Sequence, residues 1–580
     1  MKTHFYSVFG RVVCWAALAA ALIQAGWAAE VQRLDWRRPK KLVATGWDHP
    51  DAQRFRQHLA QMERWPFDGA VLELVGQRDD GKPCLMRALF HAEPWKPQWF
   101  ASAVEQLRAC RPERLKDNFI LVGANPGNVD WFDDAGWQAI VEHWRIAAWV
   151  AKQAGCRGLL FDPEPYTPPY AQFQYSQQAE SAKHSFDQYW AKARQRGRQV
   201  MEVLAAEYPE MTLFCYFLLS VHMHAAAHGD PRPALAGSGY GLLPAFLDGW
   251  LDAAPASMTF VDGCESAYRY NSRSELLEAA VAIRGRCQEL ISPENRAKYR
   301  AQVQVGFGIY LDAYWNPPSS PWYIDGLGGS RVDRLRANVR DALEIADEYV
   351  WIYGEKFRWW PTPHPRVQAQ TWPEALPGCD AALAFARDPI CFARRELSRL
   401  QSAGQIANLL QNGDFGAEKL TLEGRQVVWQ EGRPPVGWSA WQAEDSKGVI
   451  VWDRQTEAGK GESGSAGSAK LAGVANGCLL QAIPVQPGQR YAVQARCRRT
   501  GQGQVHLRIR WQTPESRWTQ ESHDVLAYPE DRPGAAWSEL FTVVEVPEGV
   551  GKLLVLLSAQ GQKSVEDAAW FDDVLVVRLP

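Results

Sequence analysis

Neither sign of charge is in excess in this sequence. Of its 580 residues, 63 are Lys or Arg and 66 are Asp or Glu, which leaves a net charge of −3. Charges of both signs are mixed along the chain, with no basic patch and no acidic tail. A surface for nucleic acid or for an anionic membrane needs clustered Lys and Arg. We therefore expect no nucleic-acid partner.

Cysteines with the spacing of a metal site are missing as well. The sequence has 11 Cys, and no two of them form a C-x-x-C pattern or stand at zinc-finger spacing. Structural zinc sites depend on such closely spaced thiolates. The sequence therefore predicts no metal cluster and no cofactor for catalysis, and it leaves the disulfide connectivity open.

Long apolar runs are confined to the first residues. A basic start precedes the apolar stretch 12–25, and Gly26 and Ala28 are small enough for a signal peptidase. This order is typical of a cleaved signal peptide, predicted here as residues 1–28, and the run is too short for a comfortable membrane span. We expect an exported protein, secreted or periplasmic, without a membrane span after cleavage. The sequence makes no prediction of the oligomeric state.

Eight short apolar runs alternate with longer amphipathic segments in the first two thirds of the chain. The runs are 41–48, 69–75, 118–125, 157–164, 211–220, 257–266, 301–313 and 348–357. Between them, apolar residues recur every three or four positions, which predicts helices. Eight strand-then-helix repeats are typical of an α/β fold of the (β/α)8 TIM barrel class, predicted here for residues 29–365. An open doubly wound sheet is the alternative, but no Gly-rich phosphate turn follows the first run.

The pattern changes near residue 406, where apolar residues begin to alternate with period two between turns. This alternation predicts an all-β sandwich over residues 406–580. The Pro-rich segment before it, together with one short helix, predicts a linker over residues 366–405.

Acidic residues stand where the predicted barrel strands end, which is where barrel active sites lie. Asp162 and Glu164 close the fourth run, in "LLFDPEP". Alternation along a strand puts both side chains on one face, and the prolines keep the segment extended. Two carboxyls so close cannot ionise independently, so one of them should have a raised pKa. The alternative is an acid pair that caps a helix or binds an Arg.

This segment resembles the retaining glycoside hydrolases built on barrels, which place their acid/base at the end of strand four. "GLLFDPEPY" also looks like the end of the D-x-x-D-x-D-x-E signature of chitinase-type hydrolases, although Arg157 and Leu160 replace its upstream acids. The resemblance implies that Glu164 protonates the glycosidic oxygen, and we assign Asp162 as its modulator.

A glycosidase needs a second carboxylate across the scissile bond. Glu265 in "FVDGCESAYRYN" is the first candidate for the nucleophile or base, and Glu355 in "VWIYGEKFRWW" is the next. The alternative for each is an ion pair with a nearby Arg or Lys.

Substrate contacts are expected from aromatic and polar residues at the same strand ends. The flat, rigid ring of Trp suits stacking on sugars, and the chain has 27 Trp, most of them expected in the core. The predicted substrate-binding residues are Trp47, Asn125, Tyr166, His222, Asp262, Tyr268, Tyr310, Asp312, Trp315 and Trp359. His222 and His224 also form an H-x-H pair, so a metal-dependent hydrolase is a further alternative.

The sandwich segment resembles carbohydrate-binding modules of the jelly-roll type in "NLLQNGDFG", "VGWSAW", "VQPGQRYAVQARCR" and "WFDDVLVV". The resemblance implies a structural calcium held by Asp414 and by Asp572 or Asp573. Taken together, the sequence predicts an exported glycoside hydrolase that cleaves a poly- or oligosaccharide. The main alternative is a non-catalytic carbohydrate-binding protein with a degenerate barrel.

Overall fold

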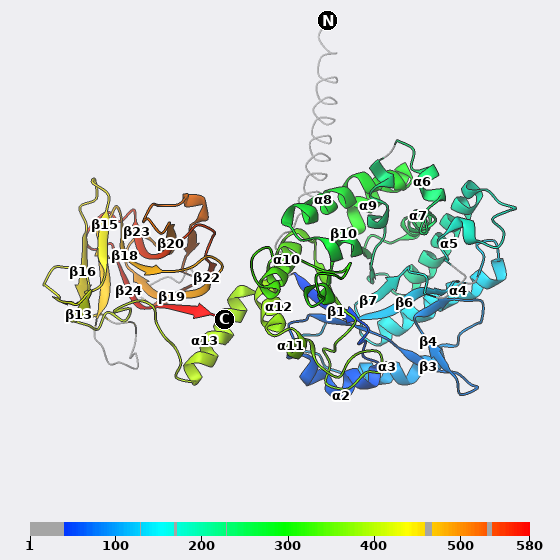
Figure 1. The fold of residues 1–580 in the computed structure, drawn as a ribbon, viewed down its shortest axis with the longest axis horizontal. Helices are drawn as coiled ribbons and strands as arrows, with labels where there is room; N and C mark the ends of the chain where they lie inside the picture. The colour runs from blue at the N-terminus through cyan, green and yellow to red at the C-terminus, as the bar shows by residue number, and fades with distance from the viewer. Residues whose placement is uncertain are drawn as a thin grey trace, which may run out of the picture. The chain divides into compact units, whose positions relative to one another are not determined.

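The chain divides into two compact units, and the division falls between Arg387 and Asp388 (Figure 1). The computed structural model describes residues 40–127, 129–166, 171–227, 229–456, 458, 467–529 and 536–580. The predicted signal peptide lies outside these residues. Within them, no helix combines the length and the apolar character needed to cross a membrane. The predicted linker 366–405 contains helices of both units.

A nearly closed sheet of parallel strands forms the centre of the first unit (Figure 1). Its order is β10-β9-β8-β7-β6-β2-β1-β12-β11. The strands are β1 (Lys41–Gly46), β2 (Gly69–Leu72), β6 (Phe119–Pro126), β7 (Gly158–Asp162), β8 (Thr212–Cys215), β9 (Thr259–Asp262), β10 (Val303–Val305), β11 (Phe307–Tyr310) and β12 (Tyr349–Gly354). Each of the eight predicted runs contains a strand of this sheet. Because all neighbouring pairs are parallel, the carboxyl ends of the strands meet at one edge.

Gly306 alone separates β10 from β11, so the two ends of the sheet order are consecutive in the chain. β10 pairs with β9, and β11 pairs with β12. The Gly306 N–H donates to the carbonyl oxygen of Asp262 at 2.8 Å. A Cβ at this position would lie 3.0 Å from Val261 and 3.1 Å from the Tyr349 carbonyl oxygen, which favours glycine. The break at Gly306 therefore lets residues 303–310 pair with β9 at one end of the sheet order and with β12 at the other end.

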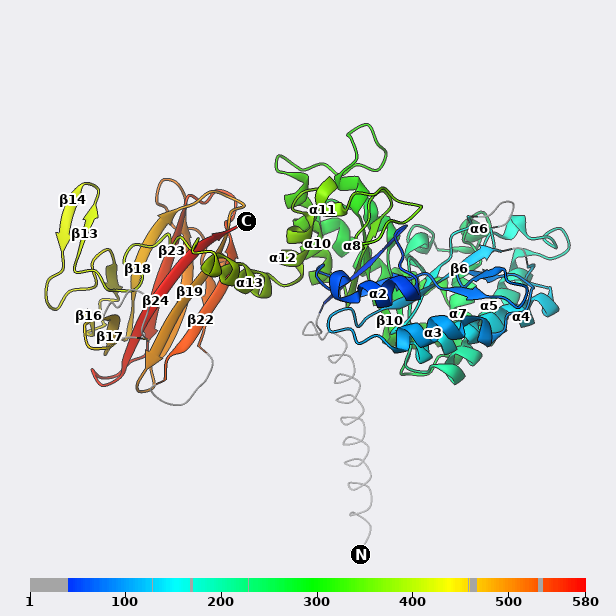
Figure 2. The ribbon, with the colours of Figure 1, turned by 90° about the horizontal axis from the view of Figure 1, so that it is seen from below.

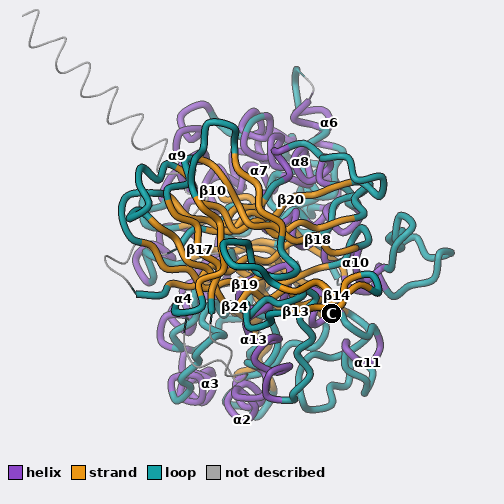
Figure 3. Tube along the Cα trace, turned by 90° about the vertical axis from the view of Figure 1, so that its left-hand side faces the viewer, coloured by secondary structure: helices purple, strands orange, loops and turns teal. Residues whose placement is uncertain are grey.

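Helices of the first unit lie on both sides of its sheet, with α8 and α9 on one side of β1 and β7 and α2 and α3 on the other (Figure 1), and Figure 3 colours helices purple and strands orange. The helices are α2 (Ala52–Met62), α3 (Ala101–Arg108), α4 (Asp134–Gln153), α5 (Phe186–Glu207), α6 (Arg232–Ala236), α7 (Leu243–Ala253), α8 (Arg273–Arg284), α9 (Arg296–Gln302), α10 (Arg331–Ile345), α11 (Trp372–Ala375) and α12 (Cys379–Arg387). Three short strands complete the unit: β5 (Ala88–Phe90) beside β6, and the hairpin of β3 (Val75–Gln77) and β4 (Pro83–Leu85).

Two glycines let α5 and α7 pack backbone against backbone. A Cβ on Gly197 of α5 would lie 2.1 Å from the carbonyl oxygen of Phe246 in α7. A Cβ on Gly249 of α7 would lie 2.0 Å from the carbonyl oxygen of Arg194 in α5. Any larger side chain at either position would force the helices apart.

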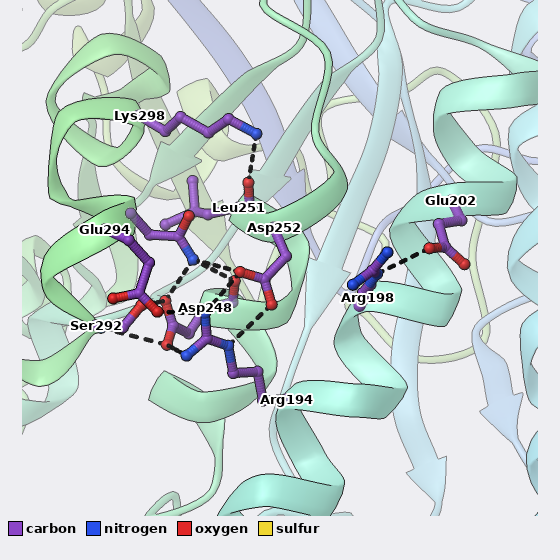
Figure 4. Close-up of polar contacts among 10 residues, drawn as sticks. Arg194, Arg198, Glu202, Asp248, Leu251, Asp252, Ser292, Glu294 and Lys298 are labelled. Atoms are coloured by element: carbon purple, nitrogen blue, oxygen red, sulfur yellow. Dashed lines mark hydrogen bonds and ion pairs between the residues drawn. The ribbon is translucent and has the colours of Figure 1, made fainter.

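An ionic cluster ties the same two helices to the segment before α9 (Figure 4). The Arg194 guanidinium lies 2.7 Å from Asp252, 2.9 Å from Glu294 and 3.1 Å from Asp248. The Ser292 hydroxyl donates to Asp248 at 2.8 Å. These acids are therefore committed to packing contacts on the outside of the sheet.

The second unit is a sandwich of two antiparallel five-stranded sheets (Figure 2). One sheet contains β15 (Ser439–Gln442), β18 (Asn476–Pro484), β23 (Lys552–Gln560), β20 (Gln504–Gln512) and β21 (Val525–Ala527). The other contains β16 (Val449–Asp453), β17 (Ser468–Ala472), β24 (Ala568–Leu579), β19 (Arg490–Arg499) and β22 (Ser538–Glu545). The apolar core lies between them. A hairpin of β13 (Lys419–Leu422) and β14 (Arg425–Val428) and the helix α13 (Pro389–Ser402) complete the unit.

We expect Gly197→Ala to lower the free energy of unfolding by about 1–3 kcal/mol, because the added methyl group meets backbone that cannot rotate away. This loss should appear even though Ala is the better helix former. Thermal unfolding followed by circular dichroism measures it. The matched control is Gly239→Ala, where a Cβ meets no atom within 4 Å. Equal melting temperatures for both variants would contradict the close packing of α5 and α7.

Candidate active site

Three strand ends bring acidic side chains together at the carboxyl edge of the first unit's sheet. β7 ends at Asp162 and leads to Glu164, β9 leads to Glu265, and β12 leads to Glu355. Burial raises the pKa of Asp162, Glu265 and Glu355, and the nearby charge of Glu164 raises the pKa of each further. The four predicted catalytic carboxyls therefore lie in one cluster.

The segment that carries Glu164 is held by side chains on both sides. Asp162 is 7% exposed, and its Oδ1 accepts the Glu164 N–H at 3.0 Å. On the other side, the Asn125 Nδ2 donates to the Glu164 carbonyl oxygen at 2.8 Å, and the Asn125 Oδ1 accepts the Tyr166 N–H at 2.8 Å. The Tyr166 hydroxyl donates to the Glu164 carboxylate. Glu164 is therefore oriented through both its backbone and its side chain.

Glu265 follows a turn that Asp262 stabilises. Asp262 is fully buried and accepts the N–H groups of Ser220 at 2.8 Å and of Cys264 at 3.2 Å. Cys264 has a φ of 44°, which is strained for a side chain other than glycine. The Glu265 N–H then donates to the Tyr216 carbonyl oxygen at 3.1 Å. The predicted substrate residue Asp262 thus has its carboxylate occupied by protein groups.

Glu355 is anchored in the same way by Asp312. The Asp312 Oδ2 accepts the Glu355 N–H at 2.8 Å, and the Tyr310 hydroxyl donates to the Glu355 carboxylate at 2.9 Å. Burial raises the pKa of Asp312 to about 6, with a further contribution from Glu355. Both of these predicted substrate residues contact Glu355. The Tyr310 side chain contacts the Glu355 carboxylate, and the Asp312 side chain contacts the Glu355 backbone N–H.

Two carboxyls of the cluster, Glu265 and Asp162, have raised pKa values. Burial raises the pKa of Glu265 to about 8, and the nearby charges of Glu164, Asp162 and Glu355 add to the effect. Burial and then the charge of Glu164 raise the pKa of Asp162 to about 7. A carboxyl with a pKa near or above 7 can donate a proton at neutral pH, which is one of the functions that general acid–base chemistry requires.

Aromatic rings line the cluster. Tyr268 stacks on Tyr310 with ring centroids 5.1 Å apart, and Tyr216 stacks on Trp351 at 4.5 Å. The Tyr268 hydroxyl is buried beside Glu265, whose pKa it lowers against the larger effect of burial. It is an electrostatic neighbour of Glu265, so it is placed to meet a ligand there.

Tyr216, Tyr240 and Trp351 belong to this surrounding and were not predicted. Tyr216 directly follows β8, and Trp351 lies on the same face of β12 as Tyr353. The position of Tyr216 at a strand end and the alternation of side chains along β12 could therefore have indicated these two residues. Tyr240 lies on the loop before α7. Burial raises the pKa of its hydroxyl most, and the charges of Glu164 and Glu265 raise it further. Nothing in the loop's own sequence signals that position.

The remaining predicted substrate residues differ from one another in their exposure and in their contacts. Trp47 directly follows β1 and is 42% exposed. His222 is buried, and its Nε2 contacts the Tyr240 carbonyl oxygen at 2.9 Å. Trp315 packs against Phe357. Trp359 is 3% exposed and packs edge-on against neighbouring rings, so the structure does not bring it to the carboxyls.

The acids expected to hold calcium lie together in the second unit. Burial raises the pKa of Asp572 to about 7, and the charges of Asp573 and Asp414 contribute. Both Asp572 oxygens accept backbone N–H groups, from Ala458 and Asp573, each at 2.8 Å. Each of these oxygens keeps a second lone pair, so the two N–H contacts do not exclude a cation.

The described residues contain no group of three or more His, Cys, Asp or Glu side chains placed to hold a metal ion. His228 of the "SVHMHAAAH" segment lies outside the described residues. Calcium in the second unit stays a prediction.

The second unit also has a cavity of about 840 Å³ beside α13. Its walls include Arg394 and Leu397 of α13, Arg496 of β19 and Phe541 of β22, and Trp537 and Tyr528 also line it. Arg394 pairs with Glu539 and lies 4.4 Å from the centre of the Phe541 ring. The cavity thus combines flat rings with charged and amide groups.

Comparison with known proteins identifies no family for the chain. No family model and no curated protein matches it. One similar solved structure is the enzymatically active domain of tailspike protein 4 of bacteriophage CBA120, with 12% identity over 30% of this chain and 21% of that chain and a TM-score of 0.22. A second is the Clostridium thermocellum endo-1,4-β-D-xylanase 10B with CBM22-1 and GH10 modules, with 12% identity over 25% of this chain and 26% of that chain and a TM-score of 0.20. A third is TmCBM61 in complex with β-1,4-galactotriose, with 12% identity over 30% of this chain and 99% of that chain and a TM-score of 0.19. The match therefore spans about a fifth of the tailspike chain. These neighbours include glycoside hydrolases and carbohydrate-binding modules, at TM-scores too low to assign a fold or a family.

We expect Glu265→Gln to gain stability relative to the wild type as the pH rises from 5 to 8. The ordinary pKa of this carboxyl is 4.5, and burial raises it to about 8 in the folded chain. Between these values the folded chain binds a proton that the unfolded chain has released, so the wild-type free energy of unfolding falls with rising pH. The glutamine amide has no such proton. Thermal unfolding at both pH values measures the difference, and an equal difference at pH 5 and pH 8 would contradict the raised pKa.

Proposed function

We propose that this protein is an exported glycoside hydrolase that acts on a poly- or oligosaccharide. The observation that carries the proposal is the cluster of Asp162, Glu164, Glu265 and Glu355, which three parallel strands bring to one edge. Two carboxyls on either side of the scissile bond carry out glycosidic hydrolysis in most glycoside hydrolases. Export rests on the predicted signal peptide. The proposed fold is a (β/α)8 barrel in which β10 and β11 count as one strand, followed by a jelly-roll sandwich.

In the proposed mechanism Glu265 is the proton donor and Glu164 is the nucleophile or base. This assignment reverses the roles that the sequence predicted. Its support is electrostatic, because a carboxyl with a pKa of about 8 keeps its proton at pH 7, as a general acid must. Glu164 accepts a hydrogen bond from the Tyr166 hydroxyl, which holds its carboxylate in place for attack on the anomeric carbon or on a water molecule.

Asp162 and Glu355 take supporting roles in this mechanism. Asp162 orients Glu164 by accepting the Glu164 N–H, and burial, followed by the charge of Glu164, raises the pKa of Asp162 to about 7. The Glu355 carboxylate adds negative charge beside Glu265 and helps to keep the Glu265 proton bound. The surrounding tyrosines provide hydroxyl groups for sugar oxygens and flat faces for sugar rings.

We expect Glu164→Gln and Glu265→Gln each to lower kcat on natural polysaccharides by about 10²–10⁴-fold. The measurement is release of reducing sugar from a polysaccharide panel. An aryl glycoside with an activated leaving group separates the two roles, because such a group departs without a proton. Glu265→Gln should therefore keep most activity on the activated substrate, whereas Glu164→Gln should lose activity on both.

The matched control for these variants is Glu105→Gln, which changes an exposed glutamate on α3. Wild-type activity in both site variants would move the chemistry away from this cluster. Binding of polysaccharide without hydrolysis by the wild-type chain would favour the non-catalytic carbohydrate-binding protein.

We further propose that the second unit holds saccharide in the cavity beside α13. We expect Trp537→Ala to weaken binding to the preferred polysaccharide about tenfold through loss of ring stacking. Affinity electrophoresis or pull-down with insoluble polysaccharide measures it. The control is Trp518→Ala, because Trp518 is half exposed but does not line this cavity. Equal loss in both variants would contradict a saccharide site at this cavity.

A further inference from the structure

The backbone ladder between β6 and β7 stops short of Glu164. The last paired residues are Gly123 of β6 and Asp162 of β7. In the same register, Asn125 stands opposite Glu164. Pro163 and Pro165 flank Glu164, and proline has no N–H group to continue a ladder. The catalytic segment therefore leaves the sheet at the position where its geometry matters most.

The Asn125 side chain replaces the missing ladder. Its Nδ2 donates to the Glu164 carbonyl oxygen at 2.8 Å, and its Oδ1 accepts the Tyr166 N–H at 2.8 Å. A side-chain amide has one donor group and one acceptor group, and here both face the backbone of a single segment. Asn125 spans Pro165 and closes the segment on both sides of it.

This anchorage opposes a repulsive force. The Glu164 carboxylate lies in the field of Asp162, Glu265 and Glu355, and like charges in a partly buried site repel one another. A segment without its own ladder would move outward to relieve that repulsion. The Tyr166 hydroxyl, whose residue is fixed by Asn125 through its N–H, draws the carboxylate back by donating to it.

We propose that Asn125 is a positioning residue that holds Glu164 in the reactive geometry, and not the substrate contact that the sequence predicted. This inference rests on the proposed function, since it names the residue that makes one of its two carboxyls effective. Each polar atom of the Asn125 side chain makes one hydrogen bond to this segment, so the side chain's orientation is fixed by the backbone on both sides of Pro165.

Kinetics distinguish the two roles. For Asn125→Ala we expect kcat to fall by about 10²-fold, because displacement of a catalytic group by about 1 Å has a cost of that size, with KM changed by less than about twofold. A substrate contact would instead raise KM and leave kcat in place. In the double variant with Glu164→Gln, the Asn125 change should add nothing, because it acts through Glu164. Full additivity or a pure KM effect would overturn the proposal.

Asn118→Ala is the matched control, because it changes the same kind of anchor at the other end of the same strand. The Asn118 side chain accepts the Ala70 N–H at 3.0 Å and donates to the Leu115 carbonyl oxygen, just before β6 begins. It should lower stability without the loss of kcat in the folded enzyme. Asn125→Gln provides a milder change if Asn125→Ala folds poorly, because it keeps the amide and shifts it by one methylene group. An unchanged kcat in Asn125→Gln would count against the anchorage.

A second measurement does not depend on activity. In the wild type the charge of Glu164 helps to raise the pKa of Glu265, so releasing Glu164 should lower it. The stability lost between pH 5 and pH 8 should then be smaller in Asn125→Ala than in the wild type, and unchanged in Asn118→Ala. If the wild-type chain hydrolyses no glycoside, the proposed function fails while this test still decides the role of Asn125. An unchanged pH dependence in Asn125→Ala would overturn the anchorage itself.

Discussion

Burial of carboxyls at one edge of the parallel sheet is the constraint on which the rest of this site depends. The carboxyl ends of parallel strands meet at one edge, and here that edge gathers four acids in a partly buried place. Three aspartates hold the segments that carry the glutamates in place. Asp162 accepts the N–H of Glu164, Asp262 accepts the N–H of Cys264 just before Glu265, and Asp312 accepts the N–H of Glu355. The aspartates at the strand ends therefore act on the backbone, and the glutamates beyond them are left to face a ligand.

The aromatic surroundings determine how strongly these charges interact. Gly308 makes room for the Trp351 ring, because a Cβ there would lie 2.6 Å from it. The Trp351 Nε1 donates to the Gly263 carbonyl oxygen at 2.8 Å, next to the turn that leads to Glu265. Rings in this position exclude water, and removal of water raises carboxyl pKa values. The same rings that pack against the parallel sheet thus help to raise the pKa of Glu265.

Local sequence patterns predicted the strands well, because each run carries its own periodicity. All eight runs contain strands of the parallel sheet, and the seventh is divided by Gly306. The pattern also placed Glu164, Glu265 and Glu355 at one edge. It could not assign their protonation, because a pKa depends on neighbours from other strands. The sequence favoured Glu164 as the acid, and the burial that raises the pKa of Glu265 could not be read from its local pattern.

Roles that depend on contacts across the sheet were likewise beyond the sequence. Asp262 and Asp312 carry the same side chain as Asp162 and stand at similar strand ends, and only their partners show that all three bind backbone N–H groups. The sequence by itself determined the strand order along the chain, the sandwich that follows and the supply of acids at strand ends. Tertiary structure decided which acids are buried, which are anchored and which remain available, because desolvation and hydrogen bonding depend on groups that are distant in the chain.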